Sequence, residues 1–177
     1  MAVGTLESYN LVDLEQLQRE HPEFGRIEII NGSLIAGGVD VTGDRHQSVV
    51  QALFLLLIKD CPADQIIRLD TYWFGQQNRL RPDLAVWRVA DRPADGGAFI
   101  VPPLAVIEVL STDADHDLVR KAEIYRTDGV EAWYIDPLSR NGWWLTDGAS
   151  VYHDGSSATI EMPARPTLTI SRDILTA

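Results

Sequence analysis

Leu104-Ala-Val-Ile-Glu-Val-Leu110 is a nearly continuous apolar run of strand length. Such a run is typical of a strand that is covered on both faces, in the interior of a sheet. Glu108 is the one residue that interrupts it. An ionised carboxylate in a buried strand is costly unless it is paired, hydrogen-bonded or bound to a metal ion. Glu108 is therefore our first candidate site residue, and the alternative is a strand-end glutamate that reaches an arginine at the sheet edge.

Hydrophobic periodicity predicts the elements around this strand. The helices are expected at residues 11–20, 44–59 and about 116–128. Further strands are expected at residues 65–74, 83–89 and 130–135, with a tight hairpin over 26–36 around Asn31-Gly32. The long helix carries a wide buried stripe that includes Phe54, Leu55 and Ile58.

This order of elements predicts an α/β (α+β) fold, with a mixed β-sheet flanked by helices. We expect one domain over residues 1–177, with its core at about 25–137 and extra antiparallel hairpins over 138–177. The hairpin turns are expected at Asn141-Gly142, Asp147-Gly148 and Asp154-Gly155.

The composition excludes several classes of protein. The chain has 177 residues, 45% of them apolar and 23% charged, which is ordinary globular composition. Its longest apolar run, residues 52–58, is far shorter than the roughly 20 residues of a membrane helix. The start of the chain lacks a secretion signal and Cys61 is the only cysteine, so we expect a soluble cytoplasmic protein. No glycine-rich phosphate loop is present, so no nucleotide cofactor is expected.

The net charge of -11 disfavours nonspecific binding to polyanions. An enzyme can still bind DNA through a local basic patch and divalent metal ions. Arg79 and Arg81 lie close to a second carboxylate, Asp83, and are candidates for such a patch. Asp83 follows Pro82 at the start of a predicted strand, although a Pro-Asp pair alone more often indicates a turn.

Lys121 is the cation that the predicted helix directs toward the sheet. At about 100° per residue it lies at the edge of the apolar face that Leu118, Ala122 and Tyr125 define. A lysine at such an edge usually extends its ammonium to solvent. Because Lys121 is an edge residue that fills no core volume, its replacement by alanine is expected to change stability by less than about 1 kcal/mol. The alternative is a site of two carboxylates that hold a divalent ion, beside an ammonium that orients water or stabilises a phosphoryl group.

Four motifs along the chain carry a resemblance to a known family. They are Arg81-Pro-Asp-Leu-Ala-Val86, Pro103-Leu-Ala-Val-Ile-Glu-Val-Leu-Ser111, Lys121-Ala-Glu-Ile-Tyr125 and Gly129-Val-Glu-Ala-Trp-Tyr-Ile-Asp-Pro137. Over roughly residues 10 to 170 the chain resembles the restriction endonuclease family called Uma (Uma-two), of the PD-(D/E)XK nuclease superfamily. The resemblance implies a restriction-endonuclease-like fold.

The resemblance also implies roles for particular residues. It makes Asp83 and Glu108 metal ligands, the Val109 backbone carbonyl a third ligand, and Lys121 the catalytic lysine. The superfamily usually carries its lysine two residues after the glutamate, where this chain has Leu110. The lysine has then moved to the following helix.

Glu28 and His46 also match family positions, with two interpretations each. Glu28 either completes the acidic cluster or is a solvent-facing hairpin residue. His46, in the first turn of the long helix, either joins the metal shell or is a surface histidine.

The favoured hypothesis is an endonuclease that uses Mg²⁺ or Mn²⁺ to hydrolyse DNA. The alternative is a catalytically silent member of the same fold that binds nucleic acid or protein. A sugar hydrolase with two carboxylates would leave Lys121 unexplained. We also expect a homodimer, because paired subunits let each site engage one strand of a duplex.

Overall fold

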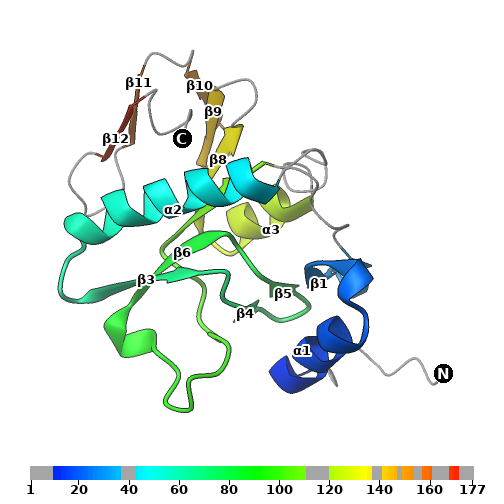
Figure 1. Ribbon diagram of the computed structural model, residues 1–177. Helices are drawn as coiled ribbons and strands as arrows, with labels where there is room; N and C mark the ends of the chain where they lie inside the picture. Colours follow the sequence, from blue (N-terminus) through cyan, green and yellow to red (C-terminus); the bar gives the residue numbers. More distant parts are fainter. Residues whose placement is uncertain are drawn as a thin grey trace.

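The computed structural model describes residues 10–36, 43–110, 120–136, 141–146, 149–153, 157–160 and 168–171 (Figure 1). The expected start of the third helix, residues 116–119, lies outside these ranges. In the described part of the chain, no helix combines the length and apolar character needed to cross a bilayer.

A six-stranded mixed sheet forms the centre of the molecule. Its spatial order is β10-β9-β8-β7-β6-β3, in which only β7 and β8 run parallel. The strands are β3 (Gln65–Leu69), β6 (Leu84–Arg88), β7 (Ala105–Val109), β8 (Glu131–Asp136), β9 (Asn141–Thr146) and β10 (Ala149–His153). The apolar run around Glu108 is thus an interior strand, and the predicted mixed sheet is confirmed.

Both faces of this sheet are covered. Helix α2 (Gly43–Lys59) runs across one face in Figure 1, where Val49, Leu53 and Leu57 pack on alternate residues of the strands. Helix α3 (Ala122–Thr127) packs on the other face through Ile124 and Tyr125. Along β7, Ala105, Ile107 and Val109 face α2. Glu108 alternates with them and therefore lies on the α3 side.

A second sheet, of order β2-β1-β5-β4, lies beside the α3 face. It contains β1 (Ile27–Ile30), β2 (Ser33–Ala36), β4 (Trp73–Phe74) and β5 (Arg79–Leu80). Strands β1 and β2 form the predicted hairpin, because Asn31 and Gly32 adopt the positive φ values of 45° and 83° that its tight turn requires.

The remaining elements are short. Helix α1 (Leu11–Glu20) begins with a capping box between Asn10 and Asp13, and its Leu14 is buried against β1. The others are the 3-10 turns η2 (Pro22–Phe24) and η3 (Val89–Asp91) and the paired strands β11 (Ser157–Ile160) and β12 (Leu168–Ser171).

Three expectations are wrong. The predicted strand 65–74 breaks at Asp70, whose φ of 48° turns the chain from the large sheet into the small one. Residues 141 and 142 lie inside β9 and form no turn. Leu55 and Ile58 point away from the sheet and are exposed, because an α-helix presents only one stripe to a flat surface.

Candidate active site

The pairing of β6 with β7 brings two carboxylates together. Leu84 lies opposite Ile107 in this antiparallel pair. Asp83 directly precedes Leu84 and Glu108 directly follows Ile107, so these two residues come next to each other. The Asp83 backbone N–H donates to Glu108 Oε2 at 3.3 Å, and both side chains are buried. The two predicted metal ligands therefore lie side by side where the central sheet ends.

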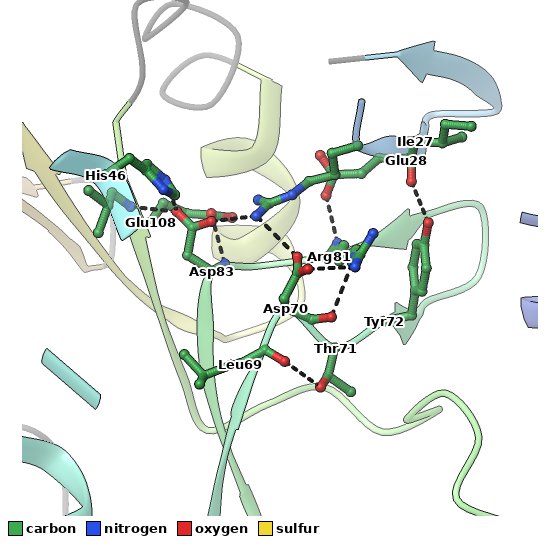
Figure 2. A network of polar contacts seen from close by, with 12 residues as sticks. Ile27, Glu28, His46, Leu69, Asp70, Thr71, Tyr72, Arg81, Asp83 and Glu108 are labelled. Carbon is green, nitrogen blue, oxygen red and sulfur yellow. Dashed lines mark hydrogen bonds and ion pairs between the residues drawn. The ribbon is translucent and has the colours of Figure 1, made fainter. Parts of the chain in front are cut away.

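Asp83 is surrounded by donors. Arg26 Nη2 donates to Oδ1 at 2.6 Å, while His46 Nε2 and the Val109 backbone N–H reach Oδ2 at 3.1 and 2.8 Å. Figure 2 shows the carboxylate with His46 and Glu108 on one side and Asp70 on the other. Burial raises the pKa of Asp83, but the Arg26 charge and the His46 hydrogen bond together lower it by a larger amount. The pKa of Asp83 is therefore well below its usual range. Asp83 is therefore ionised at neutral pH.

Glu108 is contacted by Lys121, which directly precedes α3, and by Tyr125 within that helix. The Tyr125 hydroxyl donates to Glu108 Oε1 at 2.6 Å, and Lys121 Nζ lies 3.3 Å from the same oxygen. Burial, together with the neighbouring Glu108 carboxylate, raises the pKa of Tyr125 well above its usual value. The phenol therefore stays protonated and remains a donor.

Lys121 is held between two carboxylates. Its Nζ lies 2.8 Å from Glu28 Oε2, in addition to the contact with Glu108, and its side chain is only 1% exposed. Glu28 Oε1 accepts in turn from the Arg81 backbone N–H at 2.6 Å. The prediction that Lys121 is directed toward the sheet is confirmed. The expectation of a solvated edge lysine is wrong, because β1 covers the position and supplies Glu28.

The structure excludes the surface interpretation of Glu28 and of His46, while a place for His46 in a metal shell stays a prediction. Both are buried, at 5% and 7% exposure, so neither is a surface residue. Glu28 contacts the lysine, and His46 contacts Asp83. Six predicted residues are thus brought together: Glu28, His46, Asp83, Glu108, Val109 and Lys121.

Arg79 and Arg81 are engaged within the chain. Arg79 Nη1 donates to the carbonyls of Gly75 and Asn78, and its guanidinium lies over the Phe74 ring. The Arg81 guanidinium donates to the Asp70 carboxylate and to Gln18 Oε1. Contact of either residue with DNA stays a prediction.

Sequence reasoning missed three members of this network: Arg26, Asp70 and Tyr125. Arg26 Nη2 bridges Asp83 Oδ1 and Asp70 Oδ1, at 2.6 and 3.1 Å. Tyr125 carried a usable signal, because it lies four residues after Lys121 on the same helix face. Arg26 carried none, since 57 positions separate it from Asp83.

The donor set fits a magnesium or manganese ion. Within the described ranges, no three His, Cys, Asp or Glu side chains are arranged to hold a metal ion. Mg²⁺ is nevertheless commonly bound through only one or two carboxylates plus water. Asp83 and Glu108 supply the carboxylates. The N–H and C=O of a strand residue point to the same side, so the Val109 carbonyl faces the edge where its N–H meets Asp83.

A cavity of about 460 Å³ lies beside this network. Asp70 and Arg81 form the wall that it shares with the site, and α1 contributes Glu15, Gln18 and Arg19. Asp83, Glu108 and Lys121 do not line it. The cavity is therefore adjacent to the candidate site and is not the site itself.

A mixed sheet with two carboxylates and a buried lysine at the end of its central strands defines a restriction-endonuclease-like domain. Over residues 11–172 the chain matches the family model Uma2, described as putative restriction endonuclease, and it belongs to that family. The fold is similar to the crystal structure of a putative nuclease belonging to DUF820 from Anabaena variabilis ATCC 29413. The TM-score is 0.75 at 18% identity, over 94% of this chain and 97% of that one. No curated protein matches the chain.

Proposed function

We propose that the protein is an endonuclease that hydrolyses phosphodiester bonds of DNA with the help of Mg²⁺ or Mn²⁺. The observation that carries the proposal is the pair of buried carboxylates, Asp83 and Glu108, beside the buried ammonium of Lys121. Family membership supports a nuclease. The choice of DNA as substrate and of a divalent ion as cofactor is our further step.

Asp83, Glu108 and the Val109 carbonyl would hold the ion. A divalent ion bound there supplies a water of lowered pKa and neutralises charge on the reacting phosphate. The protein residues fix the geometry of this shell. Tyr125 and Lys121 both contact Oε1 of Glu108, which orients the carboxylate and directs Oε2 toward Asp83.

Lys121 would act on the reacting groups. Its compact ammonium can orient the attacking water or stabilise charge on the pentavalent phosphoryl group. Glu28 positions this ammonium, because it contacts Nζ at 2.8 Å and is itself fixed by the Arg81 backbone. Glu28 is thus a positioning residue for the lysine.

One observation favours the alternative of a catalytically silent binding protein. All four carboxylate oxygens of Asp83 and Glu108 already contact donors of the chain, namely Arg26, His46, Val109, Lys121, Tyr125 and the Asp83 backbone. A network of this kind can serve the fold without any metal ion. The two functions differ in their response to divalent ions.

The test is a plasmid nicking assay with the full chain in Mg²⁺ or Mn²⁺. The proposal predicts nicking that EDTA abolishes and that Asp83→Asn and Glu108→Gln each reduce by about 100-fold or more. Glu123→Gln is the matched control, because this exposed carboxylate pairs with Arg126 on the surface of α3. Absence of nicking in either metal by a folded protein, or equal nicking by Asp83→Asn, would contradict the proposal.

A further inference from the structure

Arg26 occupies the oxygen that a metal ion at Asp83 would need. Its Nη2 lies 2.6 Å from Asp83 Oδ1, and the arginine side chain is 27% exposed whereas that of Asp83 is 3% exposed. Arg26 directly precedes β1, so the small sheet holds its guanidinium over the end of the central sheet. Oδ2 is already shared by His46 and the Val109 N–H. An incoming ion therefore competes with Arg26 for Oδ1.

The same guanidinium nitrogen has a second anionic partner. Arg26 Nη2 lies 3.1 Å from Asp70 Oδ1, and Asp70 is far more solvent-exposed than Asp83, at 45%. The other Asp70 oxygen contacts Arg81 Nη2, which keeps the carboxylate in place (Figure 2). A small displacement can thus move Arg26 from two carboxylates to one without leaving its charge unpaired.

Electrostatics makes this displacement the expected response to a metal ion. A guanidinium and a divalent cation on one carboxylate oxygen repel each other strongly in a buried site. Without the ion, Arg26 and Lys121 compensate the charges of Asp83 and Glu108, so the carboxylates are tolerated inside the protein. With the ion, the positive charge on Asp83 is no longer needed.

We propose that Arg26 is an exchangeable counterion of the site: it pairs with Asp83 when the metal ion is absent and is held by Asp70 when the ion is bound. This inference rests on the proposed function, because it requires the ion to bind at Asp83. It makes Asp70 the receiving partner, which keeps the guanidinium paired after it leaves Asp83.

The test is a calorimetric titration of the full chain with MnCl₂, without DNA. Arg26→Gln removes the competitor, so its Mn²⁺ dissociation constant is expected to fall by about tenfold. Asp70→Asn removes the receiving partner, so its dissociation constant is expected to rise by about fivefold. Asparagine suits the positive φ of 48° at this position, so the substitution is compatible with the turn.

Two controls separate exchange from other effects. Arg126→Gln removes an arginine of a surface ion pair on α3, and it measures the effect of net charge alone, expected to be less than twofold. In the double variant Arg26→Gln/Asp70→Asn, the Asp70 effect should vanish, because Asp70 acts through Arg26. A merely structural role of Arg26 would instead weaken Mn²⁺ binding in Arg26→Gln.

Failure of the inference and failure of the proposed function give different results. If Mn²⁺ binds to the wild type and is lost in Asp83→Asn, but Arg26→Gln binds with unchanged or weaker affinity, the exchange is wrong and the metal site stands. If neither the wild type nor Arg26→Gln binds Mn²⁺, or if Asp83→Asn binds it equally well, both are wrong. If Arg26→Gln does not fold, the Mn²⁺ affinity of Asp70→Asn tests the exchange. Weaker Mn²⁺ binding than in the wild type supports the exchange, and unchanged Mn²⁺ binding overturns it.

Discussion

Replacing Lys121 with alanine removes a buried ammonium and leaves two carboxylates without their shared cation. Nζ lies 2.8 Å from Glu28 and 3.3 Å from Glu108, and the lysine side chain is 1% exposed. Removing one partner of a buried ion pair costs about 3–5 kcal/mol, because the remaining charge stays desolvated. We therefore expect Lys121→Ala to lower the free energy of unfolding by at least about 3 kcal/mol, which replaces the value below about 1 kcal/mol that the sequence predicts for an edge residue.

Urea denaturation followed by circular dichroism measures this difference. With a denaturant slope of about 2 kcal/mol per molar, a loss of about 3 kcal/mol lowers the unfolding midpoint by about 1.5 M. Lys59→Ala is the matched control, because Lys59 is the only other lysine of the chain and lies exposed in the last turn of α2. Its midpoint should move by less than about 0.3 M.

A second substitution tests whether the cost comes from unpaired charge. Glu28→Gln in the Lys121→Ala background removes one of the two carboxylates that have lost the lysine, so it should recover part of the lost stability. In the wild-type background the same change breaks the contact with Lys121 and should destabilise. A Lys121→Ala midpoint within 0.5 M (about 1 kcal/mol) of the wild type would refute the buried ion-pair reasoning.

Two further expectations follow from the structure, and a third comes from the sequence. Tyr125→Phe removes the hydroxyl that donates to Glu108 at 2.6 Å. The free energy of unfolding, measured by thermal or chemical denaturation, should therefore fall by about 1–3 kcal/mol. Burial raises the pKa of Tyr72 to about 12, whereas the unfolded chain releases this proton near pH 10. Stability should therefore fall by up to about 2 kcal/mol between pH 10 and 12, and Tyr72→Phe should show a smaller fall over the same range. For the proposed homodimer, light scattering should give twice the chain mass of 19.7 kDa, and a monomer at all concentrations would contradict it.

Local signals made much of the fold predictable from the sequence. The cap at Asn10, the turn at Asn31-Gly32 and the left-handed Gly129, with φ 69°, each mark an element boundary through a short-range preference. The break at Asp70 was not predictable in this way, because the residues around it keep a strand-like pattern. Only the presence of two sheets requires the chain to turn there.

Some features of the candidate site were likewise predictable from the sequence, and others were not. Glu108 was found because a charge inside an apolar run is conspicuous in the sequence, and the helix periodicity directed Lys121 toward the sheet. The sequence by itself thus determined which charges had to be explained and which elements carried them. The tertiary structure alone decided how each charge is balanced, since Arg26 reaches Asp83 and Glu28 reaches Lys121 across long stretches of chain. The physical reason is that desolvation makes a buried charge depend on its nearest partners in space, and these partners are set by the packing of sheets and helices.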